Sequence, residues 1–180
     1  EIKGQITRIE KNLFSNCTSL SSIVLPGSIK RIESGAFYSS SSLEEITIPQ
    51  GVKEIGKKAF YSCPSLKRVS FPHTLEVIDD SAFYNCKSLK EIHIPSSLRE
   101  IGRDAFSYCS SLERADIEGN IENINDRVFN KCHKLREVIL PENLKTIGYR
   151  AFYECQSLKE MKMPASLEGL GEEAFARCRA

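Results

Sequence analysis

The stretch LEVIDDSAFYNCKSLKEIHIPSS, from Leu75 to Ser97, decides the fold because the chain repeats its pattern every 23 residues. Full repeats occupy residues 6–28, 29–51, 52–74, 75–97, 98–120, 121–143 and 144–166, and a partial repeat occupies 167–180. One aromatic position keeps this register without insertion or deletion: Phe14, Phe37, Phe60, Phe83, Phe106, Phe129, Phe152 and Phe175. A fixed period of this length predicts a solenoid in which each repeat forms one coil. We therefore expect a single repetitive domain over residues 1–180.

The end of each repeat predicts a β-strand. Ile92 and Ile94 alternate with the polar residues Glu91 and His93, which is the pattern of a half-buried strand. Proline follows in six of the seven full repeats and ends the predicted strand, because it has no N–H to donate. The isoleucine pair has equivalents at Ile46/Ile48, Val69/Phe71, Val138/Leu140 and Met161/Met163.

The start of each repeat predicts a second short extended segment, LxxI, followed by a turn. The residue that closes this segment is often glycine, as at Gly56 and Gly102, or a small polar residue, as at Asp79. These residue types tolerate a left-handed backbone, so we expect a left-handed turn there. The AFxxC run that follows has apolar residues at i and i+3, which predicts a single helical or 3₁₀ turn.

Stacking of the coils is an energetic requirement. Burial of a large apolar side chain contributes on the order of 1.5–3 kcal/mol, and one repeat offers only a few such side chains. Ordering a repeat costs roughly 1.5 kcal/mol per residue. A single repeat would therefore be unfolded, and we expect each residue column to form a buried ladder along the stack.

Composition limits the class of partner. The chain carries 25 basic and 24 acidic residues, a formal net charge of +1. This balance gives no electrostatic reason to expect a nucleic acid as partner. The sequence contains no apolar run of the roughly 18 residues that a membrane-spanning helix needs, so we expect no membrane insertion.

The consensus LxxIGxxAFxxCxSLxxIxIPxS resembles the BspA-like, or Treponema-type, leucine-rich repeat, and the match runs from Ile6 to Cys178. The resemblance implies a right-handed solenoid with parallel strands on its concave face. It also implies an extracellular or cell-surface location and, for several relatives, adhesion to host proteins. Ser40 departs from the pattern in place of Cys, and Ala115 and Glu118 depart in the fifth repeat. The chain starts and stops within a repeat, so we expect a fragment of a longer protein, monomeric in its full-length form.

The seven cysteines suggest metal or disulfide chemistry, but their spacing favours neither. A strict 23-residue interval supplies one Cys per coil, whereas zinc sites need clustered ligands. Cysteine side chains on parallel coils would also point the same way, which disfavours disulfides. We expect buried reduced thiols that pack as small apolar groups, and we expect no catalytic residue, metal site or cofactor.

Two surface columns are candidates for partner binding. The first is the outward face of the long strands, where exposed, chemically mixed residues suit a protein partner or are merely solvated: Glu45, Thr47, Arg68, Ser70, Glu91, His93, Arg114, Asp116, Glu137, Ile139, Glu160 and Lys162. The second column follows the phenylalanines with Tyr38, Tyr61 and Tyr84. Tyrosine is enriched at interface hot spots, but these side chains also suit packing over the phenylalanine ladder, which is the interpretation we favour.

Together these features predict a non-enzymatic module that binds a protein, such as an extracellular matrix or plasma protein. The alternative is a structural spacer or assembly scaffold for a domain outside this sequence. Catalysis would need a clustered set of acid, base, nucleophile or metal ligands, and the sequence shows no such cluster.

Overall fold

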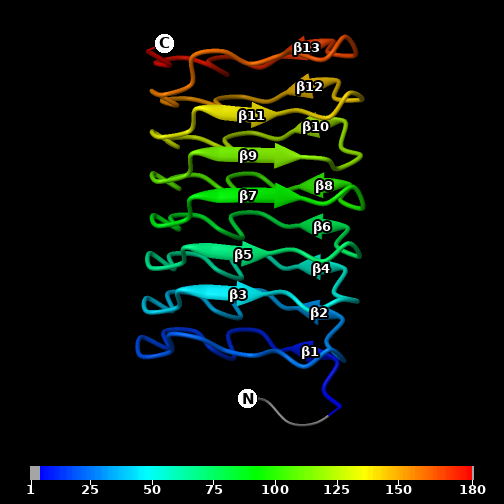
Figure 1. The fold of residues 1–180 in the computed structure, drawn as a ribbon, viewed down its shortest axis with the longest axis vertical. Helices are drawn as coiled ribbons and strands as arrows, with labels where there is room; N and C mark the ends of the chain where they lie inside the picture. Colours follow the sequence, from blue (N-terminus) through cyan, green and yellow to red (C-terminus); the bar gives the residue numbers. More distant parts are fainter. Residues whose placement is uncertain (1–4, 180) are drawn as a thin grey trace.

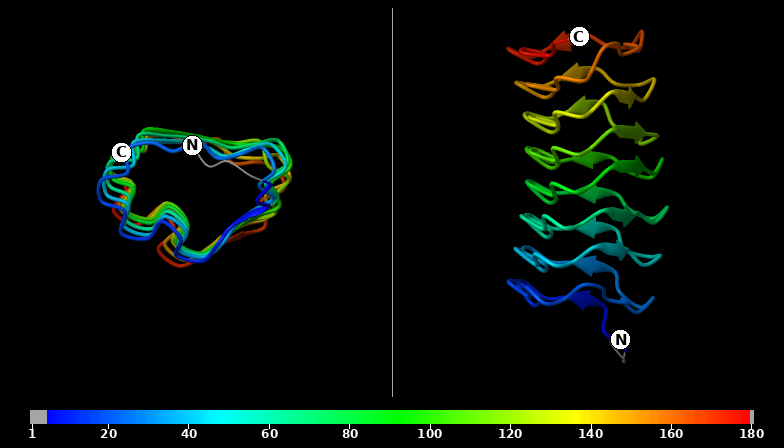
Figure 2. Two further views of the ribbon diagram at one scale, coloured as in Figure 1. Left: turned by 90° about the horizontal axis from the view of Figure 1, so that it is seen from below. Right: turned by 60° about the vertical axis from the view of Figure 1, so that its left-hand side comes forward.

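Each repeat forms one coil, and the coils stack into a right-handed β-solenoid with little bend in the view of Figure 1. The computed structural model describes residues 5–179. Viewed along the axis, successive coils superpose on one outline (Figure 2). No helix occurs within these described residues. Equivalent side chains therefore lie above one another, as the repeat predicts.

Two sets of parallel strands line the stack on opposite sides. The long set consists of β3 (Glu45–Thr47), β5 (Arg68–Ser70), β7 (Glu91–Ile94), β9 (Arg114–Ile117) and β11 (Glu137–Ile139). The short set consists of β1 (Arg8–Ile9), β2 (Arg31–Ile32), β4 (Glu54–Ile55), β6 (Val77–Ile78), β8 (Glu100–Ile101), β10 (Asn123–Ile124), β12 (Thr146–Ile147) and β13 (Gly169–Leu170). Paired residues are one repeat apart, as for Ile92 and Ala115. Both predicted extended segments are thus confirmed.

The long set does not extend to the end coils. Residues 160–163 form no strand, so the strand predicted there is wrong. Met161 does pack against the core, as predicted, but Met163 is 40% exposed instead of facing inward. No further long strand lies above this segment among the described residues to pair with its backbone or cover Met163. Proline is also not required to end a long strand, because β9 ends at Ile117 before Glu118.

The AFxxC segment is a series of tight turns, so the predicted helical or 3₁₀ turn is wrong. Two residues per coil have a left-handed backbone with φ between 52° and 66°, for example Lys58 and Ser62. A right-handed helix cannot contain such residues. Successive amides of the segment donate hydrogen bonds alternately within their own coil and to the next coil. Tyr61 donates to Lys58 O at 3.1 Å, and Phe60 donates to Ala82 O at 2.7 Å. These inter-coil bonds offset the cost of the left-handed residues, and the segment undulates in the axial view of Figure 2.

The glycines before this segment are not left-handed, so that prediction is also wrong. The backbone angle φ is not positive at Gly56, Gly102, Gly148 or Gly171. A Cβ at Gly102 would lie 2.4 Å from the amide nitrogen of Asp80 and 2.5 Å from the carbonyl carbon of Asp79. Residue 102 is therefore glycine because the neighbouring coil approaches too closely for a side chain at that point. Where Asn125 takes this position, its side chain donates to Ile101 O at 2.8 Å.

The core consists of continuous side-chain ladders. The eight phenylalanines stack with ring centroids 5.0–5.8 Å apart and ring planes within 17° of parallel. Offset stacking at this spacing is favourable beyond the burial itself. Phe37, Phe60, Phe83, Phe106, Phe129 and Phe152 are fully buried, so each coil contributes to a core that it could not form alone.

The cysteines form a parallel ladder beside the phenylalanines, and five of them are buried. Each buried thiol donates to a phenylalanine carbonyl 26 residues earlier, for example Cys63 to Phe37 O at 3.1 Å. Ser40 occupies the same column and donates its hydroxyl to Phe14 O at 2.6 Å. Burial raises the pKa of Cys63 and of Cys109 to about 12. These thiols are therefore packed, protonated groups.

Gly102→Ala should destabilise the protein by about 1–3 kcal/mol, because the added methyl group forces two coil backbones apart. Gly27→Ala is the matched control, since a Cβ there meets nothing within 4 Å and should change stability by less than about 0.5 kcal/mol. Urea denaturation followed by circular dichroism measures both. Equal stability of the two variants would contradict the close-approach explanation.

Ellman's reagent at about pH 8 should label only the half-exposed Cys17 and Cys178 in the folded protein, because the thiolate is the reactive species and the inner thiols are buried and protonated. All seven cysteines should react in guanidinium chloride. The variant Cys17→Ser/Cys178→Ser should show no rapid reaction when folded. Rapid labelling of that variant would show that the ladder opens readily.

Candidate functional site

The first candidate surface is the outward face of the long strands, which we call the long-strand face. Its residues form two columns along the stack. Strand pairing places Glu45 beside Arg68 in one column and Thr47 beside Ser70 in the other. The same register aligns Glu91, Arg114 and Glu137 in the upper coils. Arg114 and Asp116 are half-buried and the other ten predicted residues are exposed. The structure thus brings all twelve together along one side of the solenoid.

Two inter-coil ion pairs lie on this face. Arg68 contacts Glu45, and Arg114 contacts Glu137. Asp116 Oδ2 lies 3.6 Å from Arg114 and 3.5 Å from His93 Nδ1. The twelve residues comprise five carboxylates and three cations besides His93, so the face carries a small net negative charge of −2. A partner would meet two inter-coil ion pairs together with Glu91 and Glu160, which belong to no ion pair of the described residues.

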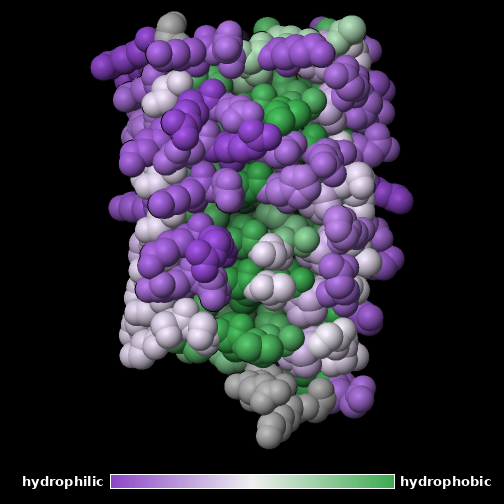
Figure 3. Space-filling view, in the orientation of Figure 1, coloured by the Kyte–Doolittle hydropathy of each residue, from purple (hydrophilic) through white to green (hydrophobic). Residues whose placement is uncertain are grey.

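Apolar side chains are exposed at the two ends of the face. Val24 is 69% exposed at the lower end, and Ile139 is 42% exposed near the upper end. Val24 borders a shallow hollow of about 430 Å³ that also involves Thr47 and Ser70. Figure 3 shows hydrophobic side chains between hydrophilic margins on this side of the molecule. Sequence reasoning missed Met163 as a member of the upper patch, because strand alternation placed it inside.

The tyrosine column forms a second aromatic ladder. Tyr38 and Tyr61 stack at 5.1 Å, Tyr61 and Tyr84 at 4.7 Å, and Tyr84 contacts the tilted ring of Tyr108 at 5.2 Å. Burial raises the pKa of Tyr84 to about 12. The ring faces cover one another and only the edges face solvent, which favours the packing interpretation over a partner anchor. Sequence reasoning missed Tyr108, because it stands one position out of the column.

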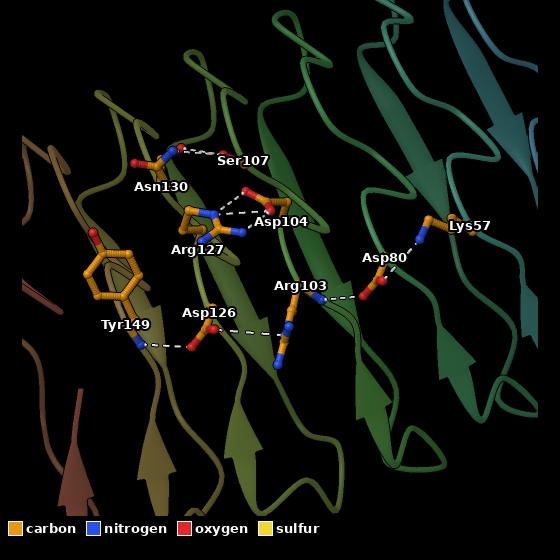
Figure 4. A network of polar contacts seen from close by, with 9 residues as sticks. All are labelled: Lys57, Asp80, Arg103, Asp104, Ser107, Asp126, Arg127, Asn130 and Tyr149. Carbon is orange, nitrogen blue, oxygen red and sulfur yellow. Dashed lines mark hydrogen bonds and ion pairs between the residues drawn. The ribbon is translucent and has the colours of Figure 1, made fainter. Parts of the chain in front are cut away.

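Ion pairs between coils cover the side of the short strands as well. Figure 4 shows Asp80 accepting from the amide of Arg103 at 2.9 Å, with Lys57 3.5 Å away. Arg127 binds Asp104 at 2.9 Å through its guanidinium group. Charges of opposite sign at equivalent positions of adjacent coils thus pair along the stack. These ion pairs could have been predicted from the aligned repeats, because Asp104 and Arg127 are one repeat apart.

Other site types are judged over residues 5–179. In that range, no group of three or more His, Cys, Asp or Glu residues is arranged to hold a metal ion. None of the described segments forms a helix long and apolar enough to cross a membrane. His73 and His93 are exposed and His133 is half-buried on separate coils. The surfaces described above are therefore the features from which a function can be argued.

Solved structures similar to this chain are bacterial leucine-rich repeat proteins. One from Bacteroides ovatus is 37% identical with a TM-score of 0.91, over 96% of this chain and 45% of that protein. The leucine-rich repeat protein of Treponema pallidum is 30% identical with a TM-score of 0.78, over 87% of this chain and 76% of that one. A leucine rich cell surface protein from Faecalibacterium prausnitzii shares the fold at 22% identity with a TM-score of 0.63, over 96% of this chain and 61% of that protein. The chain thus spans less than half the length of the Bacteroides ovatus protein.

A search of curated proteins found no match. The family model of the BspA type leucine rich repeat region matches residues 1–80 and 53–180 in six copies. These matches cover the whole chain, and the repeat spacing, the two strand sets and the solved relatives agree with them. The chain belongs to the BspA type leucine rich repeat family.

Proposed function

We propose that this chain is a non-enzymatic protein-binding module that recognises an extracellular partner, such as a matrix or plasma protein, through the long-strand face. The observation that carries this proposal is the long-strand face itself. Its side chains differ in charge and polarity from coil to coil, whereas the inward columns beneath them stay apolar. A solenoid can vary its exposed columns without disturbing its core.

The composition of the face supports a protein partner. Exposed apolar side chains at its ends, Val24 below and Ile139 and Met163 above, lie at either end of a run of paired charges. Protein interfaces combine apolar anchors with polar groups that set specificity. Paired charges on strands are held in fixed positions, so a partner can bind them with little further loss of side-chain freedom.

A cell-surface location is part of the same proposal. Family membership supports it, and the similar protein from Faecalibacterium prausnitzii is described as a cell surface protein. Its 22% identity shows a common fold only. In the proposed setting the module acts as an adhesin, and its partner belongs to the surface or matrix of another cell.

A charge-swap variant tests this proposal without changing the net charge. Exchanging Glu45 with Arg68 and Arg114 with Glu137 keeps both inter-coil pairs and loses the 3.6 Å contact between Arg114 and Asp116, but it reverses the pattern that a partner contacts. Binding to matrix and plasma proteins, measured by surface plasmon resonance, should weaken at least about tenfold, equivalent to roughly 1.4 kcal/mol.

The matched control makes the same exchange on the opposite side. Arg31 with Glu54 and Lys53 with Glu76 are inter-coil pairs on the short-strand side, with separations of 2.5 Å and 2.9 Å. This variant should bind like the unmodified protein. Equal losses in both variants would place the binding site elsewhere. If no protein in the panel binds, the adhesin proposal fails and the spacer or scaffold role replaces it.

A further inference from the structure

Inter-coil ion pairs cover much of this molecule, but one corner retains a group of lysines without them. Lys87, Lys90, Lys134 and Lys159 are exposed, and among the described residues none has a carboxylate within 4.0 Å. They lie where the chain passes from the tight turns into the long strands, at positions just before β7 and its equivalents. We call these four lysines the basic corner.

The basic corner extends along the solenoid axis. Lys90 and Lys159 belong to one residue column three repeats apart, with Glu113 and Arg136 between them. Strands spaced about 4.8 Å apart place these two lysines roughly 14 Å from each other along the stack. Lys87 lies on the coil of Lys90, and Lys134 lies on the coil below that of Lys159. The edge of the molecule that leads into β7, β9 and β11 is strongly hydrophilic in Figure 3.

Positive charge is concentrated at this corner. The corner columns between residues 41 and 159 contain six cations and two carboxylates, a net charge of +4: Lys67, Lys87, Lys90, Lys134, Arg136 and Lys159 with Glu44 and Glu113. The whole chain has a net charge of +1. Both carboxylates are already paired, Glu44 with Lys67 at 2.8 Å and Glu113 with Arg136 at 2.6 Å. The four remaining lysines are thus free to contact an external anion.

The chemistry of the corner indicates what kind of polyanion fits. No exposed large apolar side chain occurs among these described corner positions, whereas protein interfaces depend on apolar or aromatic anchors. The nearby tyrosine faces are covered by one another, so bases of a nucleic acid would find no stacking platform. A flexible chain of regularly spaced negative groups needs only a row of cations along its length.

We propose that the basic corner binds a linear sulfated polysaccharide laid along the solenoid axis. Contact with these exposed lysines costs little free energy, since no internal ion pair has to break. Binding is electrostatic, so the affinity falls as salt displaces the bound polymer. This site borders the long-strand face but shares no residue with it, and it does not depend on a protein partner.

Heparin tests this proposal, with a size-defined hexasaccharide as probe in titration calorimetry at about 0.15 M NaCl. The corner variant changes Lys87, Lys90, Lys134 and Lys159 to Ser, the residue that an adjacent coil carries at the positions of Lys87 and Lys134. The control variant changes Lys11, Lys30, Lys58 and Arg99 to Ser, which removes the same charge from exposed cations that also lie outside the ion pairs of the described residues. Thermal denaturation checks that both variants fold.

The corner variant should bind heparin at least about tenfold more weakly, as expected for four exposed charge contacts of a few tenths of a kcal/mol each. The control variant should bind within about twofold of the unmodified protein. Equal losses of heparin affinity in both variants would show that only the net charge of the protein matters, and would overturn the proposal. Absence of heparin binding, or undiminished binding of desulfated heparin, would also overturn it. Duplex DNA that binds the corner as tightly as heparin would assign the site to nucleic acid instead.

Discussion

The structure depends on hydrogen bonds that each coil makes with the next. Amides of the turn segment and of both strand sets reach carbonyls one repeat away, as Phe60 does with Ala82 O at 2.7 Å. A coil without neighbours would leave these groups to water and expose its phenylalanine and isoleucine positions. Backbone pairing and apolar burial therefore require the same register, and a shift of one residue would break both.

This dependence explains residues that appear unusual in a single coil. Left-handed residues such as Tyr108 and Lys131 are costly alone, yet each turn orients an amide toward the adjacent coil. Glycine at position 102 serves the same purpose by allowing two backbones to approach. Cysteine fits because a thiol is small enough for the core and still donates to a carbonyl. The residues that recur from repeat to repeat are therefore those that make contact between coils.

Surface residues are released from that constraint, but not entirely. Many charges lie beside an opposite charge one repeat away, so the exterior also contributes to alignment of the coils. Exposed ion pairs contribute little energy individually, and their columns can change as long as neighbours change together. A surface of this kind can present different patterns on different sides. The long-strand face carries a small net negative charge and has apolar ends, and the basic corner carries surplus positive charge.

The sequence alone determined the period, the parallel strand positions, the buried phenylalanine and cysteine columns, and the family, because a fixed spacing repeats every local pattern in register. It also placed the twelve residues of the long-strand face on one side, because strand alternation separates inward from outward positions. Only the tertiary structure decided the conformation of AFxxC, the reason for Gly102 and the exposure of Met163. Those features depend on how closely two backbones approach and on whether a neighbouring coil covers a side chain. The pairing of Arg68 with Glu45, and of Glu113 with Arg136 instead of Lys90, likewise follows from side-chain positions between coils, which periodicity brings near but does not specify.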